Sequence, residues 1–157
     1  MSFIDGHLGA YGERLDTDCG DFIVRRSDGV YAYQLAVVAD DGDMEITQVV
    51  RGADLLSSTP RQLWLYRLLG LPAPEFYHVP LLVDPDGRRL SKRDGDLDMG
   101  ALREKFTAGE IVGRLAFLAG LQEKPRSVTP AELAGVFAWE KVPVCDVTVD
   151  RTLWQNP

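Results

Sequence analysis

Residues 88–93, RRLSKR, form a dense run of positive charge and are the part of the sequence best suited to chemistry. They follow an apolar segment at 81–83 and a DPDG turn at 84–87, so a glycine lies at the root of the run. Cationic side chains on such a loop can follow the phosphates of a nucleotide as charge develops on them. The pattern therefore predicts a movable phosphate-binding loop.

The polar residues of this chain do not match the residue spacing of other common sites. A calcium loop started at Asp84 or at Asp94 places Gly95 or Lys105 where the twelfth position requires a carboxylate. The sequence also has no Gly-x-Ser-x-Gly elbow, no Cys–His pair and no Walker loop. Calcium-binding, hydrolase and P-loop functions are therefore poor interpretations.

The histidines and cysteines indicate no metal site. His7 and His78 are the only histidines, and a lone histidine near a strand end is more often structural than catalytic. Cys19 and Cys145 lie far apart and match neither a metal spacing nor a disulfide framework. We therefore expect no metal ligand among them and a reduced, cytoplasmic setting.

The composition predicts one or at most two small domains in 157 residues, with 45% hydrophobic residues available for a core. A formal net charge of −7 argues against a protein that binds nucleic acid over its whole surface. The chain has no signal-peptide pattern and no apolar run near the roughly 18 residues that span a bilayer. No membrane partner is expected.

The first part of the chain has the composition of an α/β fold. A short strand is predicted at 22–24 and a turn at 27–29. The apolar segment 31–38 fits a helix or a strand, and the acidic patch at 40–43 is expected to end it. A buried strand is predicted at 46–50, because the segment is rich in β-branched residues.

A helix is predicted next, with Thr59 as its N-cap and Gln62 completing a capping box. Pro60 suits the first helical position, and Gly70 is expected to stop the helix. The leucines of this segment are expected to form its apolar face: Leu65, Leu68 and Leu69. Strands at 76–79 and 81–83 follow. The order strand, helix, strand predicts a crossover unit of a parallel sheet.

The chain becomes helical after the cationic loop. Helices are predicted at 99–106, at 109–121 and, from a second capping box at Thr129, through Phe137. We place a boundary near residues 94–98, which divides the chain into domains at 1–95 and 96–157.

Read together, several segments of the chain resemble the glutamyl-tRNA synthetase family of class I aminoacyl-tRNA synthetases in both order and spacing. They are residues 21–29, 32–38, 50–62, 78–81 and 86–93, the last of which is similar to the KMSKS loop in its KLSKR form. Ala53 and Leu55 fit the pattern of the shortened glutamyl-Q tRNA(Asp) synthetases within that family. Too few residues follow Lys92 for the anticodon-binding domain of the full-length enzymes.

The resemblance implies a fold and a reaction. The fold is the second half of a class I Rossmann-like nucleotide-binding domain, including the KMSKS-type loop, followed by a small helical, stem-contact-like region. The reaction converts glutamate and ATP to glutamyl-adenylate and pyrophosphate, and then passes glutamate to the queuosine base of tRNA(Asp). Its implied partners are ATP with Mg²⁺, glutamate, and tRNA(Asp) or tRNA(Glu).

The resemblance also implies roles for particular residues. Tyr33 and Arg51 match the family positions that hold glutamate, and a guanidinium with a phenol suits a carboxylate. Lys92 is expected to be catalytic through its charge. The implied ATP-binding residues are Lys92, Ser91, Arg89, Gly52 and Val79, with Asp54 as a weaker candidate.

The sequence departs from the family pattern at several points. The His-Ile-Gly-His motif and the family's zinc-ligand cluster are absent, so an amino-terminal half is an expected partner and Cys19 is given no metal role. Glu45 stands where the family usually has Gly. Three interpretations stay open: the carboxy-terminal half of a synthetase of this family, a non-catalytic module that binds ATP or tRNA, and a half-domain without independent function.

Overall fold

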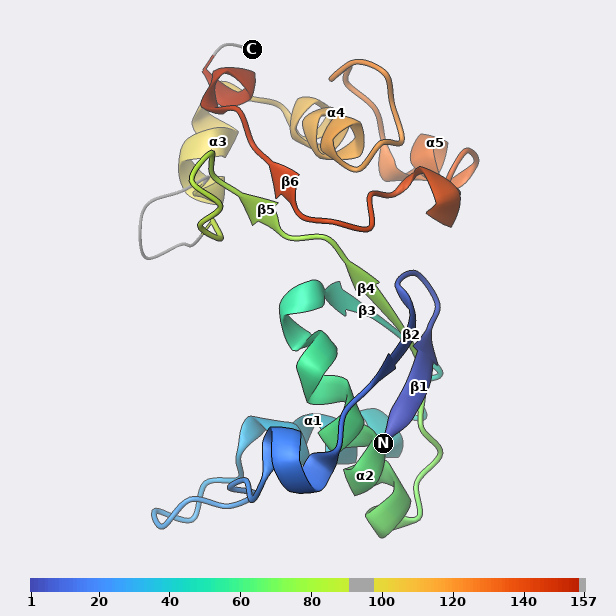
Figure 1. The fold of residues 1–157 in the computed structure, drawn as a ribbon. Helices are drawn as coiled ribbons and strands as arrows, with labels where there is room; N and C mark the ends of the chain where they lie inside the picture. Colours follow the sequence, from blue (N-terminus) through green and yellow to red (C-terminus); the bar gives the residue numbers. More distant parts are fainter. Residues whose placement is uncertain (91–97, 156–157) are drawn as a thin grey trace. The chain divides into compact units, whose positions relative to one another are not determined.

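The computed structural model describes residues 1–90 and 98–155, apart from the side chain of Arg151. It divides into two compact units, Met1–Val79 and Pro80–Pro157 (Figure 1). The domain boundary predicted from the sequence at 95–96 falls among the residues outside this description, so that boundary stays a prediction. None of the described helices is long and apolar enough to cross a membrane.

The first unit combines a hairpin with a parallel pair of strands. Strands β1 (Ser2–Asp5) and β2 (Gly9–Gly12) are antiparallel. Strands β3 (Gln48–Gly52) and β4 (Glu75–Val79) are parallel, and helix α2 (Thr59–Leu69) connects them. Parallel neighbours require such a crossover connection. The predicted strand–helix–strand unit is therefore confirmed.

Segment 31–38, which fitted either helix or strand, lies largely in helix α1 (Tyr33–Asp43). The helix runs through the acidic patch that we expected to end it, because its backbone hydrogen bonds continue to Met44. The chain then turns at Glu45, a non-glycine residue with a φ of 54° in the left-handed region. This is the conformation that favours the glycine of the family pattern.

Two strand predictions in this unit need correction. Residues 22–24 form no strand, because the only ladder contact nearby is an isolated bridge between Arg25 and Tyr31, although the turn at 27–29 is present. Strand β3 begins at Gln48, later than predicted, and its Val50 is 60% exposed rather than buried. Among the described residues β4 is the only strand paired with β3, so one β3 edge has no strand partner there.

Helix α2 ends as predicted, at a left-handed Gly70 (φ 68°). Its predicted capping box is wrong, because Thr59 is the first helical residue and the N-cap, Ser58, makes no side-chain cap. The hydroxyl of Thr59 is used elsewhere, as described below. Leu65 is buried, but Leu68 and Leu69 are 62% and 48% exposed, so only part of the predicted apolar face packs.

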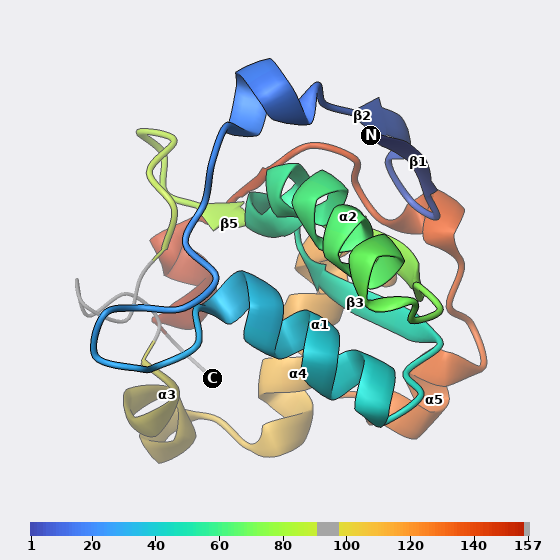
Figure 2. The same cartoon turned by 90° about the horizontal axis from the view of Figure 1, so that it is seen from below.

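The core of the first unit lies where α1 and α2 pack side by side on the β3–β4 pair (Figure 2). Its buried members are Val38, Leu65, Tyr66 and Phe76. Two short connecting helices complete the unit: the π-type η1 (Leu15–Cys19) before α1, and the 3₁₀ helix η2 (Ala53–Ser58) between β3 and α2. This packing fixes the carboxyl ends of β3 and β4, where three of the predicted substrate residues lie: Arg51, Gly52 and Val79.

The second unit begins with β5 (Leu82–Val83), which pairs in parallel with β6 (Val147–Thr148). Helices α3 (Met99–Lys105), α4 (Ala108–Leu118) and α5 (Pro130–Ala134) lie between these strands in sequence. The three helix predictions are therefore confirmed, although α4 and α5 end earlier than expected. The capping box at the start of α5 is present, with Thr129 and Glu132 each accepting the other's backbone N–H.

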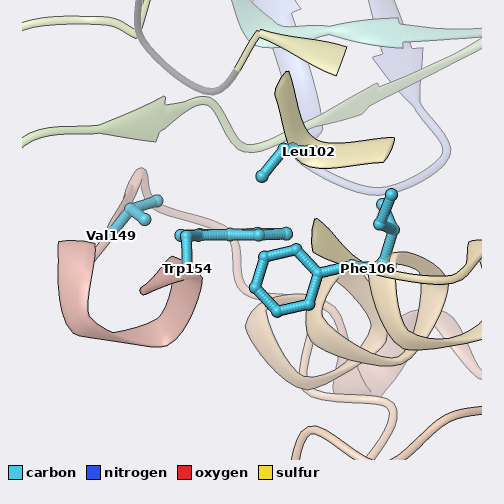
Figure 3. Close-up of a cluster of buried hydrophobic side chains, with 5 residues drawn as sticks. Leu102, Phe106, Val149 and Trp154 are labelled. Atoms are coloured by element: carbon cyan, nitrogen blue, oxygen red, sulfur yellow. The ribbon is translucent and has the colours of Figure 1, made fainter. Parts of the chain in front are cut away.

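In the core of the second unit, buried side chains pack around the indole ring of Trp154. Trp154, in the final 3₁₀ helix η5 (Arg151–Trp154), packs edge-on against Phe106 with the ring centroids 6.2 Å apart (Figure 3). A shorter 3₁₀ helix, η4 (Trp139–Lys141), precedes β6. The buried members of the core are Leu102, Phe106, Ile111, Val149 and Trp154.

Candidate substrate site around Arg51

Arg51 lies near the carboxyl end of β3, with its guanidinium held by three neighbouring elements. Its Nε donates to Nε2 of His78 in β4 at 3.0 Å. Its Nη2 donates to the hydroxyl of Thr59 at the start of α2 at 2.8 Å, and more weakly to the carbonyl of Leu55. The ring of Phe76 lies 4.9 Å from the guanidinium carbon. The side chain is therefore fixed in position and direction.

His78 is completely buried. Its sequence position suggested an isolated histidine, but in the structure it has polar partners. Its Nδ1 lies 2.6 Å from Oδ2 of Asp5, whose side chain is also fully buried. Because arginine can only donate, Nε2 of His78 must be the accepting nitrogen and Nδ1 must carry the proton. Asp5 and Arg51 thus determine one tautomer of a neutral imidazole.

Charge in this buried group is balanced by hydrogen bonds. Burial would raise the pKa of Asp5, but bonds from the His78 ring and from the backbone N–H groups of Leu8, His7 and His78 outweigh it and hold that pKa below its usual value. Burial is also the main reason why the pKa of His78 is lowered, helped by the charge of Arg51 and opposed by Asp5. An ionised Asp5, a neutral His78 and a charged Arg51 are the consistent set.

Tyr33 is the first residue of α1 and is 55% exposed. Burial lowers the pKa of Arg51, and Tyr33 is among the ionisable groups near enough to act against that shift. Tyr33 thus lies in the neighbourhood of Arg51, and joint binding of one substrate by the two residues stays a prediction. The next residue, Gln34, bonds to Ser58 and Gln62 and ties the start of α1 to α2.

Gly52 and Val79 occupy the last positions of β3 and β4 and are paired in register. Arg51 and His78 are the pair immediately before them. In open parallel sheets, ligands bind in the crevice outside the carboxyl ends of the strands. The structure thus brings three of the predicted substrate residues, Arg51, Gly52 and Val79, to one such edge.

The cationic loop belongs to the second unit and is partly described. Asp84 accepts hydrogen bonds from the backbone N–H groups of Asp86 and Arg88 and from Nε of Arg88 at 3.0 Å. Arg88 is therefore neutralised within the turn. Arg89 is exposed and forms an isolated bridge with Val83. Ser91 and Lys92, to which we gave ATP-binding and catalytic roles, lie outside the described residues.

Sequence reasoning missed two members of the site, Asp5 and Thr59. Asp5 bonds to a histidine 73 residues away, and no local pattern links the two. Thr59 was expected to cap a helix, but its hydroxyl serves Arg51 and His78 instead. The one sequence feature that could have drawn attention to Asp5 is its place immediately before Gly6, at the end of a short strand.

The described residues contain no group of three or more His, Cys, Asp or Glu side chains that could hold a metal ion. Cys19 and Cys145 both have free thiols. The fixed guanidinium of Arg51 is suited to an anionic substrate.

Comparison with known proteins identifies the fold and its family. Residues 11–142 match the family model of the class I tRNA synthetases (E and Q), catalytic domain. A solved glutamate tRNA ligase of Elizabethkingia meningosepticum, in complex with its amino acid, superposes with a TM-score of 0.79 at 26% identity. The superposition covers 98% of this chain and 34% of the ligase chain. The Elizabethkingia anophelis glutamate-tRNA synthetase gives the same TM-score.

Curated relatives are more similar in sequence. A glutamyl-Q tRNA(Asp) synthetase of Symbiobacterium thermophilum is 54% identical over 79% of this chain and 39% of its own length. The protein of the same name from Nitratidesulfovibrio vulgaris is 50% identical over 91% of this chain and 44% of its own. The chain thus spans less than half the length of these relatives. It belongs to the glutamate and glutamine branch of the class I tRNA synthetases, and within that branch it is similar to the glutamyl-Q tRNA(Asp) synthetases.

Proposed function

We propose that this chain carries one half of a site that activates glutamate with ATP and transfers it to tRNA, as in a glutamyl-Q tRNA(Asp) synthetase. The observation that carries the proposal is Arg51. Its guanidinium is fixed at the carboxyl end of a parallel strand, with Nε and Nη2 bonded to the protein. Nη1 has no partner among the described residues, so this nitrogen can donate to a substrate carboxylate.

Glutamate has two carboxylates, and activation uses one of them. An oxygen of the reacting carboxylate attacks the α-phosphorus of ATP, the bond to pyrophosphate breaks, and glutamyl-adenylate forms. We assign Arg51 to the other carboxylate, since a charge-assisted bond would hold the reacting one back. Tyr33, exposed at the start of α1, adds a directed hydrogen bond to the same substrate.

From the family resemblance, we assign two sets of residues to ATP: Gly52 and Val79 in the first unit, and Arg89, Ser91 and Lys92 in the second. Gly52 allows close approach of the backbone, and Val79 offers backbone groups to the adenine. Lys92 stabilises the charge that develops on the phosphates, supported by Ser91 and Arg89. Because the described residues offer no cluster of metal ligands, we assign no side chain to Mg²⁺, which would accompany ATP.

The acceptor is proposed from the relatives. Two curated proteins at 50% identity or more are named glutamyl-Q tRNA(Asp) synthetases, which favours tRNA(Asp) and its queuosine base. The solved structures that superpose on the chain are glutamate-tRNA ligases, which keeps tRNA(Glu) as the alternative acceptor. Transfer of radiolabelled glutamate to queuosine-containing tRNA(Asp), compared with tRNA(Glu), separates the two.

The activity is tested by ATP–pyrophosphate exchange with glutamate. The chain is assayed together with a polypeptide carrying the part of the Symbiobacterium thermophilum relative that lies outside the match; we call this pair the assembled enzyme. We expect glutamate-dependent exchange. Absence of exchange from a correctly folded pair would overturn the enzyme proposal. Binding of tRNA that is lost in Lys92→Ala would then favour a non-catalytic binding module.

A further inference from the structure

A buried chain of polar groups runs behind Arg51 and connects four elements. It starts at Asp5 in β1, passes through the ring of His78 in β4, and ends at the guanidinium of Arg51 in β3. Thr59 in α2 closes the group, since its hydroxyl lies 2.8 Å from Nη2 of Arg51 and 3.3 Å from Nε2 of His78. The side chains of Asp5 and His78 are 0% exposed, so neither can touch a substrate directly.

In the row of polar groups from Asp5 through His78 to Arg51, chemistry determines which group donates each hydrogen bond. Three backbone N–H groups bond to Oδ1 of Asp5, which leaves Oδ2 for the imidazole. An aspartate that accepts from Nδ1–H keeps the proton off Nε2. Only an unprotonated Nε2 can accept from Nε of Arg51. The orientation of the guanidinium therefore depends on the carboxylate of Asp5, which acts on it through the ring of His78.

We propose that Asp5 and His78 are positioning residues that hold the guanidinium of Arg51 in the orientation that binds the substrate carboxylate. The inference rests on the proposed function, because it takes Arg51 to be the carboxylate-binding group. Phe76 supports the same orientation by stacking on the guanidinium. With Nε and Nη2 bonded to the protein, rotation of the guanidinium away from the substrate would break two hydrogen bonds.

Acid should disturb this arrangement. Protonation of Nε2 turns it into a donor that faces the Nε–H of Arg51, and two donors repel. The ionisable groups that act on His78 are Asp5 from β1, Arg51 from β3 and Asp54 from η2. Those that act on Arg51 are Tyr33 and Asp41 from α1, Tyr66 from α2 and Asp5. The only one of these groups that ordinarily titrates between pH 5 and 8 is His78.

The decisive variant is Asp5→Asn, which keeps the size of the side chain. Its amide can donate to Nδ1 of His78 and so moves the ring proton to Nε2, opposite Nε of Arg51. In the assembled enzyme we expect the KM for glutamate to rise about 10- to 100-fold, with kcat and the KM for ATP changed by less than about threefold. The matched control is Asp43→Asn, an exposed position at the end of α1, for which all three constants should stay as in the wild type.

A second readout is independent of activity. Long-range proton–nitrogen NMR of the 157-residue chain distinguishes the tautomers of His78, and the Nε resonance of Arg51 reports its hydrogen bond. We expect an unprotonated Nε2 in the wild type and a protonated Nε2 with a shifted Arg51 Nε in Asp5→Asn. If the assembled enzyme shows no exchange, the proposed function fails, while these spectra still decide whether Asp5 holds Arg51.

Substitutions of His78 guard against a variant that fails to fold. In His78→Gln the amide oxygen can reach the Nε2 position and accept from Arg51, whereas in His78→Asn it cannot. We expect His78→Gln to retain a KM for glutamate within about fivefold of the wild type and His78→Asn to raise it more than about tenfold. A folded Asp5→Asn with an unchanged KM for glutamate and an unchanged Arg51 Nε resonance would overturn the inference. So would equal effects of the two His78 variants.

Discussion

Nε of Arg51 donates a hydrogen bond to Nε2 of His78 over 3.0 Å, and together with the bond between Nδ1 and Asp5 this contact determines which nitrogen of the buried imidazole carries the proton. It joins two adjacent residues of a parallel strand pair, since Arg51 and His78 are directly opposite in the register of β3 and β4. The pairing places the guanidinium at the carboxyl edge of the sheet, where ligands of such folds bind. Several measurable properties follow from this arrangement and from the packing around it.

Arg51→Lys should weaken glutamate binding although it keeps the charge. A lysine ammonium cannot bond to His78 and Thr59 and also present a planar edge to a carboxylate. Loss of one charged hydrogen bond costs about 1.5–3 kcal/mol, which corresponds to a rise in the KM for glutamate of roughly 10- to 150-fold. Exchange kinetics of the assembled enzyme at varied glutamate measure this. An unchanged KM would remove Arg51 from the substrate site.

Lys92→Ala should lower kcat for pyrophosphate exchange about 100-fold or more, with the KM for glutamate nearly unchanged. The proposed role of Lys92 is to stabilise charge that develops on the phosphates, so its effect belongs to the transition state. Lys124→Ala, which removes a lysine outside every proposed role, serves as the control. A rise in the KM for glutamate without loss of kcat would contradict this role.

The free energy of unfolding should fall as the pH is lowered below about 6.5, the ordinary pKa of histidine. The pKa of His78 is lowered in the folded protein, chiefly by burial. The unfolded chain therefore takes up a proton before the folded protein does, and stability is lost as the pH falls from that value towards the lowered pKa. The lowered pKa of Asp5 extends the loss to more acidic pH.

Urea denaturation at pH 7.5, 6.5, 5.5 and 4.5 measures this dependence. His78→Gln removes the titrating ring, so its stability should change less than that of the wild type between pH 6.5 and 5.5. Equal slopes in the two proteins would show that His78 does not control acid stability.

Glu45→Gly should raise the free energy of unfolding by about 1 kcal/mol, because a left-handed conformation costs a residue with a Cβ roughly 1–2 kcal/mol. Glu45 has a φ of 54° and is exposed, so the substitution removes no buried contact. Glu45→Ala removes the same charge but keeps the Cβ, and it should not stabilise the chain. Chemical denaturation compares the three proteins. Equal gains from Gly and Ala would assign the effect to charge instead.

The edge of β3 that lacks a strand partner among the described residues should make the isolated chain associate or unfold with low stability. Val50 is 60% exposed on β3, and only β4 pairs with that strand among the described residues. Unpaired strand edges and exposed apolar residues promote association. Light scattering after size exclusion should show a mass that rises with concentration, and less so for Val50→Thr. A stable monomer with cooperative unfolding would contradict this expectation.

Local signals in the sequence were reliable where they depend on neighbouring residues. The Thr129 capping box and the Gly70 helix end are present because caps are satisfied within one turn of the helix. The Thr59 capping box failed although its residue pattern is equally good. A partner outside the helix, the guanidinium of Arg51 in β3, competes for the Thr59 hydroxyl. A half-buried arginine donor has few other acceptors on the protein, so the tertiary bond displaces the local one.

By itself, the sequence determined the parallel strand–helix–strand unit and the helices of the second unit, and it supplied Tyr33, Arg51, Gly52 and Val79 as predicted substrate residues. The hydrophobic pattern, the helix caps and the motif spacing can all be read from the order of residues in the sequence. Only the tertiary structure decided what holds Arg51. Asp5, Arg51 and His78 are brought together from β1, β3 and β4, and nothing in their separate sequence surroundings links them. Burial makes each of these polar groups need a partner, and the fold determines which one it finds.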